Sequence, residues 1–186
     1  MPTPAKTSRP ELVGIARSLV ERGGADAMTL NAVATAAGVK APSLYKHFSD
    51  RAALMKAVEI DVLLELEAAL RTGTTGRTPK VRLTSMARAY RAFAVAEPHR
   101  YAIVYSGNAA TDPEIQAACL FSAQPLFEEL RNAGIKPGRM LPLARTLTAF
   151  LHGFVSMEIA NAFQLGGSIE EAFTEGVGVV LAEIRG

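Results

Sequence analysis

One short stretch of the chain, residues 40–51, gathers side chains that could bind nucleic acid. Hydroxyl, amino, imidazole and guanidinium groups occur there close together, on Ser43, Tyr45, Lys40, Lys46, His47 and Arg51. Such groups donate hydrogen bonds to phosphate oxygens and to base edges. Ala41 and Pro42 are small enough to allow close approach to a groove, and they could touch a thymine methyl group. This chemistry predicts contact with double-stranded DNA.

The same residue types suggest which contacts each side chain makes. We assign phosphate contacts to Tyr45, Lys46, His47 and Arg51, with Thr29 added at the start of a helix, and base-edge contacts to Lys40, Ala41, Pro42 and Ser43. Lys6 and Arg9 could add contacts from the N-terminal arm. Four of these assignments have a simpler alternative, in which Tyr45 only packs, His47 is a plain surface or core histidine, Lys46 is solvated in the free protein and Arg51 pairs with a carboxylate.

Two short helices must position this stretch. Residues 30–37 and 41–48 are predicted helices separated by Gly38-Val39, where glycine can adopt the positive φ that a tight turn needs. The hydroxyl of Thr29 can cap the first helix. The small side chain of Ala34 lets the two helices approach closely, while apolar residues fix the second helix on its supports, namely Val33, Ala37, Val39, Leu44 and Phe48. The pattern is typical of a helix-turn-helix.

The rest of the chain is also predicted to be helical. Ser8 and Glu11 form a capping box before a helix that Gly23-Gly24 ends, and Asp50 caps a long helix over residues 51–71. After a linker at 72–79, further helices are expected at 79–96, 98–106, 113–133, 138–165 and 168–185, with a kink at Pro125. The predicted fold class is all-α.

The run AVATAAGVKAPSLYKHFSDRAAL resembles the DNA-binding domain of TetR-family transcriptional regulators, over roughly residues 8–56. Leu151-His152-Gly153 resembles the Trp-His-Gly motif of one TetR-type C-terminal domain, with leucine in place of tryptophan. The resemblance implies a three-helix helix-turn-helix domain at residues 1–52. A long helix would join it to a helical effector-binding and dimerisation domain at 53–186.

By the same resemblance, the protein is a homodimeric regulator, a repressor that leaves a palindromic operator when a small-molecule effector binds. Two recognition helices about 34–36 Å apart could then enter successive major grooves. An effector that shifts the far end of the long helix would alter this separation. It must bind more tightly to the protein whose recognition-helix spacing does not fit DNA than to the protein whose spacing does. The alternative is a dimeric DNA-binding protein that responds to no ligand.

The last two helices are the predicted dimer interface. Residues 143–165 are apolar nearly all round, so this helix should be buried on two sides, against its own core and against a second subunit. The final helix could complete a four-helix interface through Ile169, Phe173, Val177, Val180 and Ile184, and small residues would allow close approach at Gly153, Ser156, Ala160, Gly176 and Gly178. A wholly intramolecular core is the alternative.

An effector site is predicted from large apolar side chains with polar tips, because binding pockets combine these properties. The candidates are Met86, Tyr90, Phe93, Tyr101, Tyr105, Phe121, Phe127 and His152. Each of them could instead belong to the core, and His152 could simply bond a backbone carbonyl.

Composition argues against other classes of protein. Net charge is only +2, but residues 1–50 carry six basic and four acidic side chains while the remainder carries fourteen of each. The single cysteine, Cys119, cannot build a disulfide framework or a cysteine zinc site, and the three histidines are scattered. We therefore expect no metal, no cofactor and no enzymatic activity. With no signal peptide or membrane span visible, a soluble cytoplasmic protein is expected.

Overall fold

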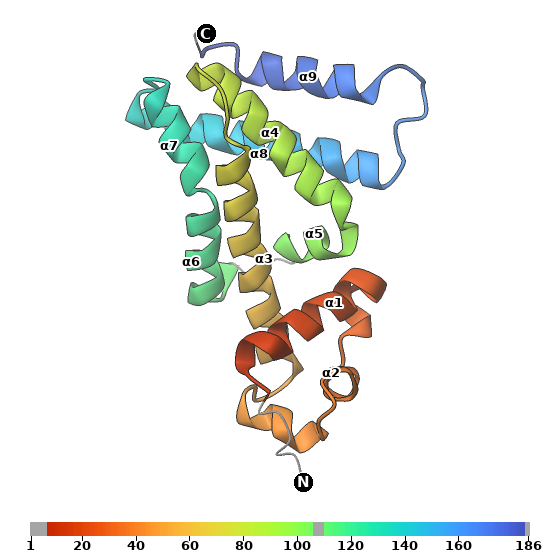
Figure 1. The fold of residues 1–186 in the computed structure, drawn as a ribbon. Coiled ribbons are helices and arrows are strands. Elements are labelled where there is room, and N and C mark those ends of the chain that lie inside the picture. Colours follow the sequence, from red (N-terminus) through yellow and green to blue (C-terminus); the bar gives the residue numbers. More distant parts are fainter. Residues whose placement is uncertain (1–6, 106–109, 185–186) are drawn as a thin grey trace. The chain divides into compact units, whose positions relative to one another are not determined.

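The computed structural model of the chain describes residues 7–105 and 110–184, and the regular elements within these ranges are all helices (Figure 1). The predicted all-α fold is therefore confirmed. The helices are α1 (Arg9–Ala27), α2 (Leu30–Ala36), the 3₁₀ helix η1 (Ala41–Lys46), α3 (Arg51–Gly73), α4 (Pro79–Ala96), α5 (Pro98–Val104), α6 (Pro113–Ser122), α7 (Gln124–Asn132), α8 (Pro137–Ile159) and α9 (Ile169–Val180).

The chain divides into two compact units. Unit 1 comprises Met1–Leu63 and Glu97–Ala118, and unit 2 comprises Leu64–Ala96 and Cys119–Gly186. Helices α3 and α6 each contribute residues to both units. Unit 1 thus takes in α5 and the beginning of α6, which the sequence places far from the helix-turn-helix. The functional boundary between residues 52 and 53 stays a prediction.

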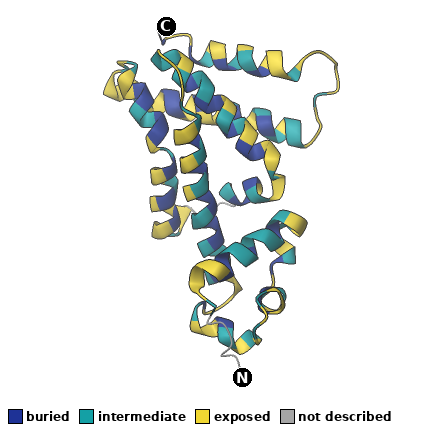
Figure 2. Ribbon diagram, in the orientation of Figure 1, coloured by how far each residue is buried: buried dark blue, intermediate teal, exposed yellow. Residues whose placement is uncertain are grey.

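The core of unit 1 forms where α5 packs on α1. The inner face of α1 buries Leu12 and Ala16, and α5 buries Tyr101 (Figure 2). The predicted capping box at the start of α1 is confirmed, since the Ser8 amide donates to Glu11 Oε2 at 2.7 Å and the Glu11 amide donates to Ser8 Oγ at 3.4 Å. The helix is interrupted at Gly23-Gly24 as predicted, but helical turns resume through Ala27.

Unit 2 is held together by an ion cluster centred on Arg91 of α4. Its guanidinium donates two hydrogen bonds of 2.7 Å to the carboxylate of Glu158 on α8, and one of 2.5 Å to Glu170 on α9. It also lies 4.9 Å from the ring centroid of Phe173. Hydrogen bonds with Glu158 and then Glu170 raise the pKa of Arg91. One half-buried cation therefore links three helices.

Two predicted helices differ from the observed ones for reasons of backbone chemistry. The segment 113–133 is two helices, α6 and α7, and Pro125 lies in the first turn of α7, where a missing amide hydrogen costs nothing. The prediction of one kinked helix was wrong. The segment 138–165 ends as a helix at Ile159, close to Asn161, whose φ of 51° lies in the left-handed region.

The end of the chain also differs from its prediction. The last helix ends at Val180, not at residue 185, and residues 106 and 185 lie outside the described part of the chain. Lys6 lies outside it as well. No helix in the described residues is long and apolar enough to cross a membrane.

Within unit 1, Lys56 of α3 contacts the beginning of α6. Its ammonium lies 2.7 Å from Asp112 Oδ2 and 3.0 Å from Glu114 Oε1. Asp112 also caps α6, because its Oδ1 accepts the amides of Glu114 and Ile115 at 2.9 and 3.3 Å. Lys56 first, and then these amides, lower the pKa of Asp112.

We predict that this carboxylate makes the stability of the protein depend on pH. Because the pKa of Asp112 is lower in the folded state, its contribution is present above the unfolded pKa of about 3.9 and is lost as the pH falls through the folded pKa. Urea unfolding of D112N should therefore show a smaller loss of stability between neutral and acid pH than the wild type. Equal losses in the two proteins would contradict this, and D26N, at an exposed site, is the control.

Candidate nucleic-acid interface

The predicted helix-turn-helix is present in unit 1. Thr29 Oγ1 accepts the amide of Ala32 at 3.1 Å and so caps α2. Gly38 has φ +66°, and the Val39 amide donates to the Ala34 carbonyl at 3.0 Å across the turn. Nothing lies within 4 Å of the position of a Cβ on Gly38, so the backbone conformation, not the available space, requires glycine here.

The second element, η1, is a 3₁₀ helix, and this changes which residues share a face. Residues three apart eclipse one another in such a helix. Ala41, Leu44 and His47 therefore form one row, and Leu44 in its centre is fully buried. Pro42 and Tyr45 form the second row, with Tyr45 58% exposed.

The third row of η1 consists of Ser43 and Lys46. Ser43 is half-buried and Lys46 is exposed. Lys40, in extended conformation directly before η1, is exposed too. Leu44 at 0% exposure and Phe48 at 2% hold the opposite side of the segment in the core of unit 1. The outer side of the segment 40–46 is therefore open to solvent.

Thr29 and the predicted contact residues from Lys40 to Arg51 all lie in unit 1. Six of them are exposed, namely Thr29, Lys40, Pro42, Tyr45, Lys46 and Arg51, whereas Ala41, Ser43 and His47 are half-buried. Arg9 is exposed as well, and its guanidinium lies 4.8 Å from the centroid of the Phe48 ring. The structure thus places all of these residues in unit 1, most of them exposed, and their DNA contacts stay predictions.

Arg51 differs from the others in that its guanidinium already has partners. Nε donates to the Met28 carbonyl at 2.8 Å and Nη2 to the Ala25 carbonyl at 2.5 Å. These partners are backbone oxygens, not the carboxylate considered from the sequence. Asp50, directly before it, accepts the Ala53 amide at 2.8 Å and caps α3 as predicted, and this bond is the main cause that lowers the pKa of Asp50.

The predicted effector residues are divided between the two units. Tyr101 of α5 and Tyr105, the C-cap of α5, lie in unit 1, where their rings meet edge to face at 5.5 Å. The other six lie in unit 2: Met86, Tyr90 and Phe93 are buried on α4, Phe127 and His152 are half-buried, and Phe121 is exposed. Burial lowers the pKa of His152.

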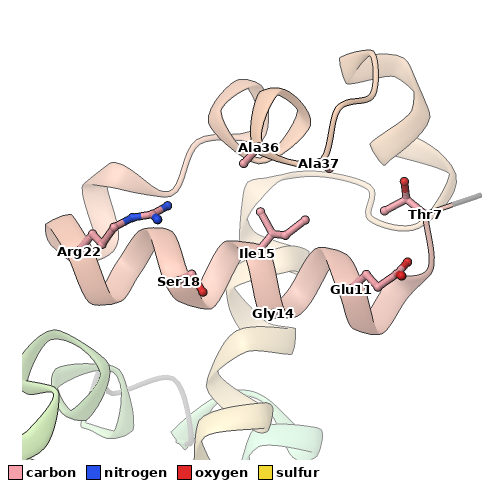
Figure 3. A pocket seen from close by; sticks show the side chains of 8 residues that line it. All are labelled: Thr7, Glu11, Gly14, Ile15, Ser18, Arg22, Ala36 and Ala37. Carbon is pink, nitrogen blue, oxygen red and sulfur yellow. The ribbon is translucent and has the colours of Figure 1, made fainter. Parts of the chain in front are cut away.

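Three cavities in the structure have other linings. The largest, about 550 Å³, lies between α1 and α2, and Ile15 points across it from α1 toward α2 (Figure 3). A second, of about 470 Å³, is lined by residues that include Arg51, Lys56 and Asp112. The third, of about 300 Å³, adjoins Arg91 and Glu170. None of these three is lined by a predicted effector residue. Among the described residues, no cluster of histidine, cysteine or acidic side chains could hold a metal ion.

Comparison with known proteins agrees with this geometry. Residues 12–58 match the family model of bacterial regulatory proteins of the tetR family, and residues 83–180 match that of the tetracyclin repressor-like C-terminal domain. An uncharacterized HTH-type transcriptional regulator of Mycobacterium tuberculosis is 36% identical over 159 residues, which cover 85% of this chain and 73% of that protein.

Solved structures show the same fold. A protein of unknown function from Rhodococcus sp. RHA1 is 26% identical with a TM-score of 0.85, and the match covers 100% of both chains. The Q116A variant of TetR from Acinetobacter baumannii AYE, in complex with minocycline, is 22% identical with a TM-score of 0.69, and the match covers 95% of this chain and 96% of that one.

Fold, site and comparisons together define a helix-turn-helix transcriptional regulator, a DNA-binding protein and not an enzyme. The chain belongs to the TetR family. The narrower C-terminal subtype suggested by Leu151-His152-Gly153 stays a prediction.

If Lys46 contacts a phosphate, its removal should weaken binding to operator and random DNA about equally. Each phosphate contact contributes about 0.9 to the slope of log affinity against log salt, so K46A should flatten this slope by about one. Fluorescence anisotropy across a salt series measures both quantities. Lys136, which is exposed in unit 2, supplies the matched control K136A. A slope identical to that of the wild type would remove Lys46 from the interface.

Proposed function

We propose that the protein is a homodimeric repressor that binds a palindromic operator in the cytoplasm and leaves it when a small-molecule effector binds. The observation that carries the proposal is the two-sided character of the segment 40–48. Leu44 and Phe48 are buried, while Lys40, Tyr45 and Lys46 project into solvent. A segment with this arrangement can enter a major groove without unfolding anything.

The contacts with DNA follow from the rows of η1. Pro42 and Ser43 stand at its beginning beside Lys40, and we propose that these three meet base edges together with Ala41. Tyr45 and Lys46, one turn later, would reach the phosphates, as would Thr29 at the start of α2. His47 and Ala41 share the row of buried Leu44, so their contacts would be made by the atoms that stay exposed.

The homodimer is proposed to form through the outer sides of α8 and α9. Phe173 and Val177 are buried within unit 2, so they are not available to a second subunit in the way the sequence suggested. Large hydrophobic residues that are exposed on these helices include Leu141 and Met157 on α8 and Val179 on α9, at 46%, 47% and 69% exposure. Gly153 and Gly178, both exposed, would let two helices approach closely.

Effector binding is supported by the minocycline complex of the Acinetobacter regulator, which shares this fold. We place the proposed effector site in unit 2, among the residues predicted there. A specific observation favours the alternative of a ligand-independent DNA-binding protein: Met86, Tyr90 and Phe93 are 4, 5 and 7% exposed, as core residues would be. An effector would have to open space among them.

The experiment that tests the function starts from genomic footprinting, which identifies the operator. Compounds that stabilise the protein in a thermal-shift screen are then added to the protein–operator complex, and anisotropy reports release. The proposal expects specific binding to a palindrome and release by at least one verified ligand. Specific binding that persists with every verified ligand would support the ligand-independent alternative, and absence of DNA binding at low salt would overturn both.

A charge on the outer side of α9 should break the proposed dimer. In V179E the carboxylate would have to be desolvated in the interface, so sedimentation velocity should show a monomer and operator affinity should fall steeply. L120E is the matched control, since Leu120 is 67% exposed but lies on α6. A V179E protein that sediments as the wild type does would place the interface elsewhere.

A further inference from the structure

Arg51 connects the beginning of α3 to the end of α1. Its Nε and Nη2 atoms donate to the carbonyls of Met28 and Ala25, at 2.8 and 2.5 Å. Met28 is the C-cap of α1, and a positive charge is favourable near the carbonyls at a helix end. The last turn of α1 contains no basic residue of its own. Arg51 supplies that charge from a different helix.

The bonded carbonyls lie directly before the DNA-facing part of unit 1. The Met28 side chain is fully buried, and the next residue, Thr29, is the N-cap of α2. The Met28 amide donates to the Ala25 carbonyl at 3.3 Å and the Thr29 amide to the Ala27 carbonyl at 3.2 Å, so the connection between α1 and α2 is a tight turn. Arg51 holds this turn at both of its ends.

We propose that Arg51 is a positioning residue for DNA binding, which orients α2 and hence η1 through the turn at residues 25–29. This proposal rests on the proposed operator binding. It replaces the direct phosphate contact that the sequence predicted for Arg51. Two of the three guanidinium nitrogens are already used inside the protein. The planar fork of arginine can reach two carbonyls at once, whereas lysine presents a single point charge.

This difference between arginine and lysine provides the test. R51K keeps the positive charge but loses the fork, so we expect operator binding about tenfold weaker than that of the wild type, with an unchanged salt slope. K136R is the matched exchange at an exposed cation of unit 2, outside the proposed interface, and it should bind with wild-type affinity. Anisotropy across a salt series measures both variants.

A second measurement needs no DNA. In the free protein, hydrogen exchange at the first amides of α2, such as those of Ala32 and Val33, should be several-fold faster in R51K, while the urea midpoint of global unfolding stays close to that of the wild type. If the wild-type protein does not bind DNA, the proposed function is refuted. The hydrogen-exchange rates at the start of α2 would still show whether Arg51 holds the turn at residues 25–29. The two failures are thus distinguishable.

Other outcomes would overturn the proposal. If R51K binds operator as the wild type does and R51M flattens the salt slope by about one, Arg51 contacts a phosphate directly. If exchange at the start of α2 is the same in R51K and wild type, Arg51 does not hold the turn. Should R51M fail to fold, R51K and its exchange pattern decide the question.

Discussion

The burial of Leu44 and Phe48 is the interaction on which the DNA-facing surface depends. Both side chains are essentially inaccessible, and they anchor a segment in which Lys40, Pro42, Tyr45 and Lys46 are exposed. Fully burying a leucine or phenylalanine stabilises a protein by about 1.5–3 kcal/mol each. Six residues of 3₁₀ helix could not keep a fixed orientation by their own hydrogen bonds. The apolar anchors therefore decide which polar groups face outward.

The positions of the helices around the helix-turn-helix could be predicted because the sequence signals for them are local. Capping residues, prolines in first turns and the glycine at position 38 each specify backbone geometry within three or four residues. The same locality explains the failures. Pro125 predicts a disturbed helix, but a proline fits both a kinked helix and the first turn of a new one, and α7 in fact begins at Gln124.

Contacts between side chains and partners distant in the sequence could not be predicted from the sequence. Arg51 was recognised as a cation near the interface, yet its bonds to carbonyls more than twenty residues earlier require the folded arrangement of α1 and α3. The 3₁₀ geometry of η1 was likewise unforeseen, and it moved His47 onto the half-buried row. The effector candidates were chosen by residue type alone, and residue type does not reveal that Tyr101 lies in unit 1 and Phe93 in unit 2.

The central claim is that the outer face of residues 40–46 meets the duplex, and Tyr45 offers the most direct measurement. Hydroxyl-radical labelling followed by mass spectrometry reports the accessibility of single tyrosine rings. Tyr45 is more than half exposed in the free protein, whereas Tyr90 is buried and serves as an internal reference. The account predicts strong protection of Tyr45 when operator is added. Equal labelling of Tyr45 in a verified operator complex would contradict it.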